Sequence, residues 1–538
     1  MRTRQPAILS ALAACLLGLG GGAAQGTDAV PVPVQGHGPG HPHATTPGIA
    51  WFDGSVEQAF AAARDAHKPV FLYWGAIWCP PCLELKSTIF LRRDFQQRLA
   101  LFVPVYLDGD NAGAQAWGEK FHVTGYPTVL VLGGDQVELE RVAGGMDLAR
   151  YADVLDLALG QTRPAQDLLA ALGAGDAPLS EQDCRRLAYN AWRLDDAWVL
   201  HPESLGTLAA ALERAAALCP AVLPAERARL ALSALLAHLQ VQAKDIEAGK
   251  APSAALRSLM SRLAPVLADR HLALASGDLL RAMPEDYFAA AVRLDPGSRA
   301  RLRAQWFDAM DAQTADRGYS AADQLDALRS KLIAAQALDP AGRIPAPLAA
   351  QVTQRIDTAL AREREPYARA SLVNSALNAL ATLGDDDRAQ AILAGEIRTS
   401  ENPYYYMSDL ADLEEKRGHQ QAAIDWLAQS FMTARGPATR VQWGTGYVRG
   451  LVRMRPQDEA AVRDAALAVL AELDASADLH GRTRRSLDGM ETALRNWSRD
   501  GAHAAPIAAL RARMHEICGR LAVADASRPA CEAFLAGA

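Results

Sequence analysis

The hydrophobic pattern changes character about a third of the way along the chain. Apolar runs of strand length begin at Val70 and recur at 101–107, 128–132 and 137–142, and Gly-Gly-Asp joins the last two. Short runs bounded by turn residues predict strands, and Gly-Gly-Asp between two of them predicts a hairpin. After about residue 162 such runs disappear, and apolar residues recur at helical spacing to the C-terminus. The pattern predicts an α/β domain followed by a large all-α region.

The segments between the predicted strands carry helix signals. Ser55 precedes a helical pattern and Gln58 stands three residues later, which is the spacing of a capping box. Further helices are expected over residues 94–99, 114–121 and 147–159. Strands and helices therefore alternate in this part of the chain, as in an α/β domain.

The first strand leads directly into Trp78-Cys79-Pro80-Pro81-Cys82. A Cys-x-x-Cys pair at a strand-to-helix junction is typical of a redox site. Cys79 is expected at the helix N-terminus, where unpaired N–H groups and the helix dipole stabilise a thiolate, the form that attacks disulfides. Cys82 would lie about one turn further and resolve a mixed disulfide. Pro80 and Pro81 suit the first helical turn, where a missing N–H costs nothing, and they stiffen the active-site loop.

Three other interpretations of the motif compete with the redox site. A structural disulfide within Cys-x-x-Cys would constrain little of the chain. A zinc site requires a second Cys or His pair at suitable spacing, and none follows, so no metal site is expected. A chance match is disfavoured by Tyr126-Pro127-Thr128, which opens another buried strand. The redox interpretation is favoured.

Together these motifs resemble the thioredoxin superfamily over about residues 48–162. The resemblance implies a central mixed sheet flanked by helices. It also implies that Pro127 follows a cis peptide bond beside the sulfurs, and that the backbone of Tyr126 pairs with a bound substrate chain. Trp78 would shield the cysteine pair.

The motif departs from ordinary thioredoxin. That family usually has a buried acid six residues before the first cysteine, which helps to deprotonate the second, and Tyr73 stands there in this chain. Pro80 replaces the usual glycine and Leu83 the usual lysine. These changes are similar to exported thioredoxin-like proteins, including the outer domain of transmembrane disulfide reductases.

The N-terminus is typical of an export signal. Arg2 and Arg4 precede an apolar stretch too short to span a bilayer, so residues 1–26 are predicted to be a cleaved signal peptide. Cys15 also fits a lipoprotein signal, although apolar sequence continues past it. Residues 27–47, rich in Pro, Gly and His, are expected to be a flexible linker. The mature protein is expected in the periplasm or secreted, soluble or lipid-tethered.

Export also agrees with the cysteine count. Removal of Cys15 with the signal leaves six of the seven cysteines. Beyond the active pair stand Cys184, Cys219, Cys518 and Cys531. Export favours structural disulfides, and bridges Cys184–Cys219 and Cys518–Cys531 would join neighbouring helices. Sequence leaves three pairings open for four cysteines, and free buried thiols remain an alternative.

The all-α region is too long for a simple bundle, which favours helical hairpins or an α-solenoid. We divide it into residues 163–365 and a repeat-like part, 366–538. Gly384 and Gly418 each precede a small helix residue by five positions and lie 34 residues apart, the period of tetratricopeptide repeats. The resemblance to that family covers about two repeats.

Large aromatic residues gather in these repeats, at Tyr404, Tyr405, Tyr406, Trp426, Trp443 and Tyr447. They could line a groove that grips a peptide, but aromatic residues more often fill the core between helices, and we favour that interpretation. The formal net charge of −7, which falls to about −9 without Arg2 and Arg4, argues against nucleic-acid binding. The basic run 482–485 is interpreted as a solvated helix face.

The sequence therefore favours an exported thiol:disulfide oxidoreductase whose Cys79/Cys82 pair acts on disulfides of protein substrates. We favour the reductive direction, because the export-linked families that it resembles mostly reduce. No nicotinamide or flavin motif is present, so no cofactor is expected and a membrane-embedded electron donor is implied. The alternative is a helical scaffold, adaptor or chaperone-like protein whose redox domain serves for docking, isomerisation or oxidation.

Overall fold

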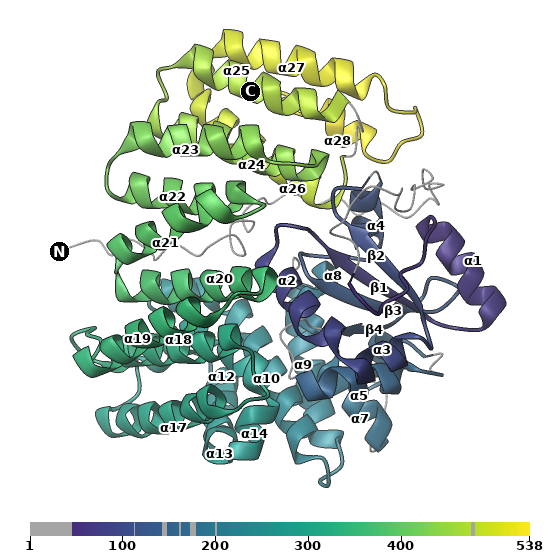
Figure 1. The fold of residues 1–538 in the computed structure, drawn as a ribbon, viewed down its shortest axis with the longest axis vertical. Helices are drawn as coiled ribbons and strands as arrows, with labels where there is room; N and C mark the ends of the chain where they lie inside the picture. Colours follow the sequence, from purple (N-terminus) through teal and green to yellow (C-terminus); the bar gives the residue numbers. More distant parts are fainter. Residues whose placement is uncertain are drawn as a thin grey trace.

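The computed structural model places an α/β domain beside a long series of stacked helices (Figure 1). The structure describes residues 46–111, 113–142, 148–160, 163–172, 179–199, 202–474 and 479–537. The predicted signal peptide, Cys15 and all but the last two residues of the 27–47 linker lie outside the described residues.

A four-stranded mixed sheet forms the centre of the α/β domain. Its strands are β1 (Val70–Gly75), β2 (Val103–Asp108), β3 (Thr128–Leu132) and β4 (Glu138–Val142), in the spatial order β2-β1-β3-β4. β1 pairs with β2 in parallel and with β3 in antiparallel register, and β3 and β4 form the expected hairpin. All four predicted strands are confirmed.

Helices cover both faces of this sheet. They are α1 (Val56–Ala66), α2 (Pro80–Ser87), α3 (Arg93–Leu99), α4 (Ala114–Lys120) and α5 (Leu148–Ala158). Ser55 and Gln58 make the capping box at the start of α1. Successive residues of β1 face opposite sides: Phe71 and Tyr73 pack in the core with α2, α3 and α5, and Leu72 packs in the core with α1 and α4.

Helices make up the rest of the chain. Those before residue 363 are α6 (Ala165–Ala171), α7 (Glu181–Tyr189), α8 (Asp196–Val199), α9 (Pro202–Leu218), α10 (Pro224–Val241), α11 (Ala243–Glu247), α12 (Ala254–Ser261), α13 (Leu263–Ala268), α14 (Arg270–Ala275), α15 (Gly277–Ala282), α16 (Pro284–Ala291), α17 (Pro296–Ala315), α18 (Ala321–Leu338) and α19 (Ala346–Arg362). The following ones are α20 (Pro366–Leu383), α21 (Asp386–Thr399), α22 (Pro403–Lys416), α23 (Gln420–Thr433), α24 (Pro437–Met454), α25 (Glu459–Ala471), α26 (Gly481–Trp497), α27 (Ala504–Cys518) and α28 (Arg528–Glu532).

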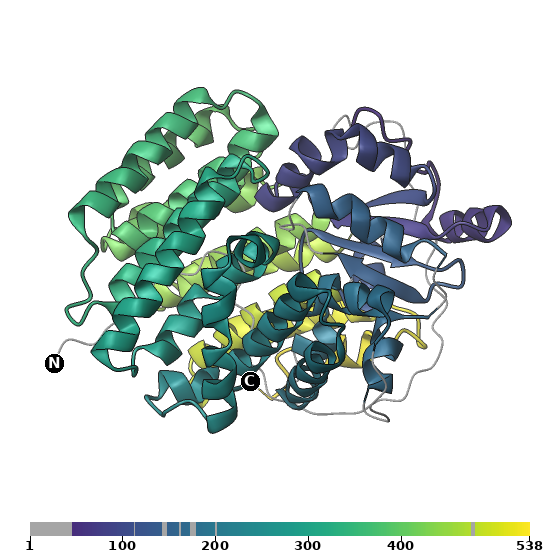
Figure 2. The same ribbon diagram turned by 90° about the horizontal axis from the view of Figure 1, so that it is seen from below.

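From α17 to α25 each helix packs against the next, and α26 and α27 pack on α24 and α25 (Figure 1). Seen from below, the stack and the sheet lie side by side (Figure 2). Two helices of the α/β domain touch it directly: α2 packs on α20, and α4 packs on α26. Gly384 and Gly418 both adopt positive φ in turns between helices, where glycine is favoured. That these pairs are tetratricopeptide repeats stays a prediction.

A second contact joins the sheet edge to the first helices of the all-α region. Arg186 of α7 forms an ion pair of 3.1 Å with Glu140 of β4, and both side chains are at most 1% exposed. Asn190 accepts a hydrogen bond from the Arg141 N–H of β4 and forms a β-bridge with Val142. We call this contact the fixed seam. The hydrophobic core therefore continues without a break across the predicted boundary at residue 162.

Both favoured structural disulfides are present. Cys184 of α7 is bonded to Cys219 after α9, and Cys518 of α27 is bonded to Cys531 of α28. Each bridge joins neighbouring helices, and the first lies just behind the fixed seam.

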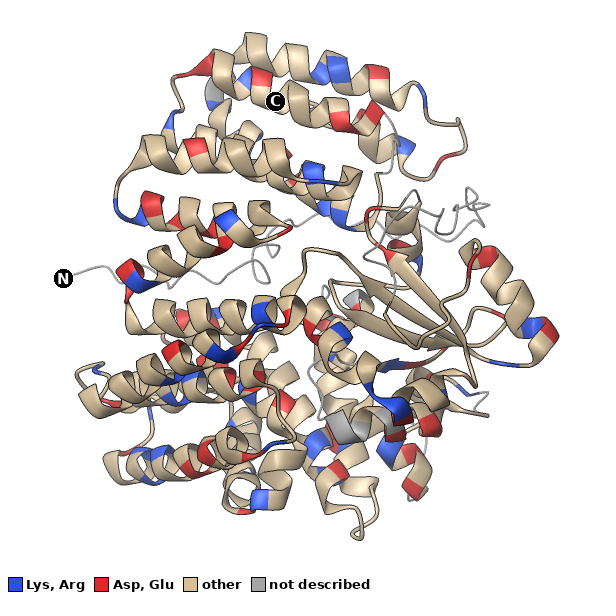
Figure 3. Ribbon diagram, viewed as in Figure 1, with Lys and Arg blue, Asp and Glu red and all other residues tan. Residues whose placement is uncertain are grey.

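Acidic and basic residues are interspersed over the helices, whereas β1 and β3 carry none (Figure 3). This mixture suits outer helix faces in water. Among the described residues, none of the helices combines the length and the apolar character that crossing a bilayer requires.

Candidate functional site

The Cys-x-x-Cys motif lies where β1 ends and α2 begins. All six residues of β1 are buried, which fixes the strand end in the middle of the sheet. Cys79 is the N-cap of α2, and its sulfur accepts a hydrogen bond of 3.3 Å from the Cys82 N–H. Pro80 and Pro81 occupy the first turn, where no N–H is needed. The predicted helix start at Cys79 is confirmed.

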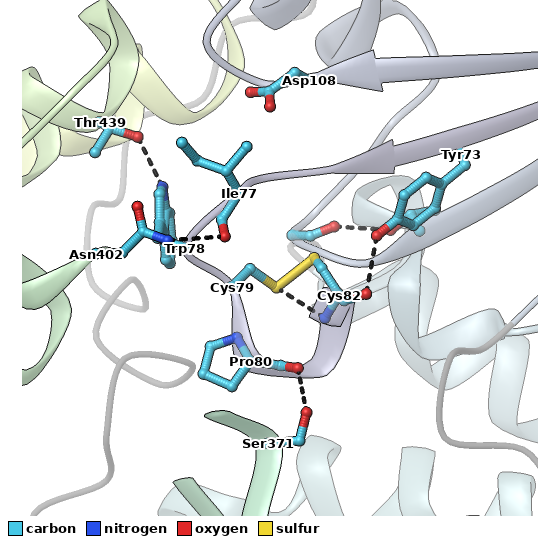
Figure 4. Close-up of a disulfide and its surroundings, with 12 residues drawn as sticks. Tyr73, Ile77, Trp78, Cys79, Pro80, Cys82, Asp108, Ser371, Asn402 and Thr439 are labelled. Carbon is cyan, nitrogen blue, oxygen red and sulfur yellow. Dashed lines mark hydrogen bonds between the residues drawn. A yellow bond between two sulfur atoms is a disulfide. The ribbon is translucent and has the colours of Figure 1, made fainter. Parts of the chain in front are cut away.

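Cys79 and Cys82 are bonded to each other, with their Cα atoms 5.2 Å apart (Figure 4). Cys79 is 3% exposed and Cys82 is fully buried. In the reduced state, the helix N-terminus and the Cys82 N–H would stabilise a thiolate on Cys79. The arrangement supplies an acidic thiol at the strand end and a second sulfur within bonding reach.

Tyr73, which stands where the resemblance implies an acid, lies beneath the motif. Its hydroxyl donates a hydrogen bond of 3.2 Å to the carbonyl oxygen of Cys82. Burial raises the pKa of Tyr73 well above its ordinary value, so its hydroxyl stays protonated at neutral pH. Tyr73 therefore holds the first turn of α2 in place and does not act as a base.

Lys86 is a charged group near the motif that the sequence analysis did not single out. It follows Cys82 by four residues, and therefore lies on the same face of α2. Its ammonium group lies 4.7 Å from the centre of the Tyr106 ring, and Tyr106 donates a hydrogen bond to Asp108. Burial lowers the pKa of Lys86 to about 8, against the opposing effect of Asp108. A lysine on the buried face of a short helix is the signal that could have revealed it.

The residues with predicted substrate-binding roles gather beside the disulfide. The Tyr126–Pro127 peptide bond is cis, the isomer that the resemblance implies, and Pro127 is buried. The ring of Tyr126 lies 6.1 Å from that of Trp78 in an edge-to-face arrangement. The structure thus brings Trp78 and Tyr126 together as two aromatic walls near the sulfurs.

The stacked helices cover this aromatic face and the loop around the disulfide. The Asn402 side chain donates to the carbonyl oxygen of Ile77 (3.2 Å), and the Ser371 hydroxyl donates to that of Pro80 (2.6 Å). Between them, the Trp78 indole N–H donates to the Thr439 hydroxyl (2.8 Å; Figure 4). We call this contact the cap seam, and the helices from α20 to α26 the cap.

Aromatic and cationic groups complete the cap seam. The rings of Tyr405 and Trp443 lie 6.0 and 5.3 Å from that of Trp78. The Arg482 guanidinium lies 4.8 Å from the Trp78 ring and 4.7 Å from the Tyr126 ring. The prediction that the basic run is a solvated helix face is therefore wrong for Arg482, because Arg482 packs on two aromatic rings. Of the repeat aromatics expected in a core between helices, Tyr404, Tyr405, Tyr406 and Trp443 are buried and Trp426 and Tyr447 are half-buried. Tyr405 and Trp443, however, pack on Trp78 of the redox loop and not only between helices.

Asp110 extends the cap seam from the loop after β2. Its carboxylate accepts hydrogen bonds from the Thr439 N–H (2.7 Å) and hydroxyl (2.5 Å), so it caps the start of α24 from outside. Trp78, Thr439 and Asp110 form a continuous hydrogen-bonded chain. Burial and the neighbouring Asp108 raise the pKa of Asp110 to about 7, although the bonds from Thr439 lower it.

Glu84 of α2 is a second carboxyl group between the two parts. The Ser320 hydroxyl, just before α18, donates a hydrogen bond to it. Burial and the like charge of Asp323 raise the pKa of Glu84 to about 8. Two carboxyl groups at the junction with the helices are therefore protonated far more readily than in water.

Alternate helices of the cap begin at the redox loop. Ser371 lies in the second turn of α20, Asn402 is the N-cap of α22, and Thr439 and Arg482 lie in the first turns of α24 and α26. Serine, threonine and asparagine are common at helix starts anywhere. Sequence alone therefore gave no sign that these three contact a loop some 300 residues earlier.

Comparison with known proteins agrees with this geometry. Residues 50–134 match the model of a family described as thioredoxin-like. The thiol:disulfide interchange protein DsbD 1 of Pseudomonas aeruginosa is 31% identical over 104 residues, which are 19% of this chain and 18% of that protein. The α/β domain is thus a thioredoxin-superfamily domain, followed by a large all-helical region. The chain spans less than a fifth of the length of the curated relative that it matches.

Proposed function

We propose that this protein is an exported thiol:disulfide oxidoreductase that reduces disulfides of protein substrates through Cys79 and Cys82. The observation that carries the proposal is the Cys79–Cys82 pair at the N-terminus of α2, with the Cys82 N–H directed at the Cys79 sulfur. The thioredoxin-like match and the similarity to a disulfide interchange protein support the same chemistry.

The reaction exchanges one disulfide for another. The Cys79 thiolate attacks a substrate sulfur, the substrate S–S bond breaks, and one substrate sulfur leaves as a thiolate that takes up a proton. The Cys82 thiol then loses its proton and attacks Cys79, which forms the Cys79–Cys82 bond and releases the second substrate thiol. Two electrons pass from the protein dithiol to the substrate. Trp78, Tyr126 and Pro127 would orient the substrate chain beside Cys79.

A further dithiol must return two electrons to the Cys79–Cys82 disulfide after each cycle. We assign this role to a membrane-embedded donor, because the sequence carries no nicotinamide or flavin motif. The charged and apolar pattern of residues 1–26 and the two structural disulfides support a location outside the cytoplasm. The protein would act there as a soluble or lipid-tethered species.

The reduction potential of the Cys79–Cys82 pair tests this function. The full-length protein is equilibrated in glutathione buffers, and the reduced fraction of the pair is measured by thiol labelling and mass spectrometry. We expect a potential between about −220 and −270 mV, the range of glutaredoxins and thioredoxins. A value above about −150 mV would instead indicate a disulfide donor.

Variants of each cysteine complete the test. Cys79→Ser is expected to abolish reduction of protein disulfides, whereas Cys82→Ser should accumulate mixed disulfides with substrates, because the resolving sulfur is missing. The double variant Cys518→Ala/Cys531→Ala is the control and should keep the potential unchanged. A potential below about −300 mV, typical of structural disulfides, together with no trapped substrate, would contradict the proposal and favour the adaptor alternative.

A further inference from the structure

We propose that the cap is a built-in occupant of the substrate face, and that an extended polypeptide carrying the substrate disulfide must displace it. This inference rests on the proposed function. The structure shows the face with the cap in place, so the oxidised protein is closed and an opening step precedes exchange.

The polar contacts of the cap seam are those that a peptide backbone would make. Around the disulfide, the loop offers two carbonyl acceptors, at Ile77 and Pro80, and one N–H donor, at Trp78. The cap meets them with a side-chain amide and two hydroxyls. The amide of Asn402 has the same chemistry as a peptide group, and a bound polypeptide can supply both donors and acceptors from its own backbone.

The apolar contacts lead to the same conclusion. Trp78 and Tyr126 are the aromatic walls of the proposed substrate face, and the cap fills the space over them with Tyr405, Trp443 and Arg482. Two aromatic rings and a guanidinium plane are groups that commonly anchor protein interfaces. A substrate chain cannot lie against Trp78 while these three side chains are there.

The sulfurs are inaccessible in the closed state. An exchange reaction requires a thiolate to approach a disulfide sulfur, and Cys79 is only 3% exposed. A hollow lies between Tyr126 and the start of α26, lined in part by Trp74, Gly125 and Arg485, but neither cysteine lines it. It therefore gives a polypeptide no route to the pair.

The two contacts of the thioredoxin-like domain show which part moves. The fixed seam contains a fully buried ion pair and a β-bridge, whose separation would expose charges and leave backbone groups unpaired. At the cap seam, Ser371, Asn402 and Thr439 make single neutral hydrogen bonds with the loop. The bonds from the start of α26 to Gln115, Glu119 and Thr124 are only partly buried. The thioredoxin-like domain therefore stays on α7 while α20 to α26 withdraw.

The rate at which reagents of different size modify Cys79 tests the proposal. The full-length protein is mildly reduced and treated with N-ethylmaleimide or with the same maleimide on a polyethylene glycol chain, and modification of Cys79 is followed by mass spectrometry. In the wild-type protein we expect the polymer reagent to be at least about tenfold slower, because the polymer requires withdrawal of the whole cap, whereas the small reagent requires only a local opening at Cys79. The ratio of the two rates removes the contribution of thiol acidity.

The triple variant Ser371→Ala/Asn402→Ala/Thr439→Val removes the three side-chain hydrogen bonds to residues 77–80, together with the bond from the Thr439 hydroxyl to Asp110. Each is worth about fivefold in the closing equilibrium, so the polymer reagent should react up to about a hundredfold faster. Thr382→Val is the matched control, because this hydroxyl on α20 bonds only to Asn378 within its own helix, and should change nothing. Should the triple variant fail to fold, Asn402→Ala alone should give about a fivefold increase.

Equal rates with both reagents in the wild-type protein would overturn the proposal that the cap must open. A triple variant that leaves the ratio of the two rates unchanged would overturn it as well. These outcomes are independent of the reduction potential. A cap that gates alkylation of a pair whose potential lies below about −300 mV would retain this inference and reject the proposed reductase. A freely alkylated pair with a potential of about −250 mV would reject this inference and retain the proposed reductase.

Discussion

The thioredoxin-like domain meets the helical region twice, and the two contacts have opposite chemistry. At the fixed seam, Arg186 and Glu140 form an ion pair withdrawn from water, and Asn190 continues the hydrogen bonding of β4. At the cap seam, Ser371 and Asn402 make single neutral hydrogen bonds to loop carbonyls. A buried ion pair is costly to break, whereas neutral bonds exchange readily with water or with a peptide. The helical region thus holds the thioredoxin-like domain firmly at the fixed seam, whereas its contact over the disulfide, the cap seam, can open and close.

The largest effect is expected at the fixed seam. Arg186→Met leaves the Glu140 carboxyl buried without its cation, and also removes hydrogen bonds to the carbonyls of Leu139 and Arg163. The free energy of unfolding should fall by about 3–5 kcal/mol. Denaturant unfolding followed by circular dichroism measures it.

Arg185→Met is the matched control for this loss. Arg185 is the preceding residue, is 39% exposed and pairs with Glu181 at 3.3 Å and with Glu226 of α10 at 3.8 Å. Because its charge stays in contact with water, its loss should cost only about 1 kcal/mol. Equal losses for the two arginines would mean that the seam is no firmer than an ordinary surface contact.

The disulfide behind the fixed seam should have the next largest effect. Cys184→Ala/Cys219→Ala opens a link between residues 35 positions apart, which should lower the free energy of unfolding by about 2–4 kcal/mol. The link between Cys518 and Cys531 spans 13 positions, so its removal should cost roughly 1 kcal/mol less. Denaturant unfolding compares the two, and neither double variant should change the polymer-to-small reagent ratio at Cys79. A change in that ratio would mean that the cap depends on distant helices.

The third effect is a pH dependence of the cap seam. Asp110, with a pKa of about 7 when the cap is closed, should return to its ordinary pKa near 3.8 when the cap opens. Between pH 3.8 and 7, Asp110 is protonated in the closed state and ionised in the open state. Closing therefore takes up a proton, so it is favoured at low pH and becomes weaker as the pH rises toward 7. Glu84 has a pKa of about 8, but the polar groups that act on it lie on α15, on α18 and just before α18, outside the cap. Its pKa should therefore not depend on whether the cap is open.

We expect the polymer-to-small reagent ratio at Cys79 to rise by about tenfold between pH 5.5 and 7.5. Asp110→Asn should abolish this rise, whereas Glu84→Gln should leave it unchanged. The charged and polar groups that face these two carboxyls and set their pKa values are Asp108, Arg281, Ser320, Asp323, Asp326, Thr439 and Arg482. A ratio that falls with rising pH would show that another group dominates.

The difference between the seams also explains what the sequence could reveal. Strands β1 to β4 and the helix start at Cys79 were predictable, because alternating apolar runs and Cys-Pro-Pro-Cys determine local structure from neighbouring residues. Apolar residues at helical spacing run through 253–267, yet this stretch forms two helices, α12 and α13. Pro265 has no N–H to bond to the carbonyl of residue 261, so the helix breaks there, and periodicity alone does not report such a break.

The cap seam was not predictable, because its residues are ordinary ones in ordinary places. Asn402 precedes a proline at a helix start, Thr439 lies in the first turn of α24, and Ser371 lies in the second turn of α20. Arg482 lies in a basic run that suits a solvated face. These residues have a role because the chain returns to the loop at residues 77–80. That contact joins residues about 300 positions apart, and no local sequence pattern encodes it.

The smallest expected effect concerns the acidity of Cys79 under the cap. The Arg482 guanidinium lies 4.8 Å from the centre of the ring of Trp78, the residue before Cys79, and a cation near a sulfur stabilises a thiolate. Arg482→Met should therefore raise the pKa of the Cys79 thiol in the reduced protein by roughly half a unit to one unit. Ultraviolet absorbance of the thiolate, followed against pH, gives this value without depending on access of a reagent.

Arg484→Met is the matched control, because Arg484 lies on the same helix and pairs with Asp488 one turn further. It should leave the thiol pKa unchanged. An effect of both arginines would indicate a general field of α26, since the field of a helix end acts on any nearby charge. An effect of neither would mean that the reduced protein already holds its cap away from the disulfide, so that the closed state belongs to the oxidised form alone.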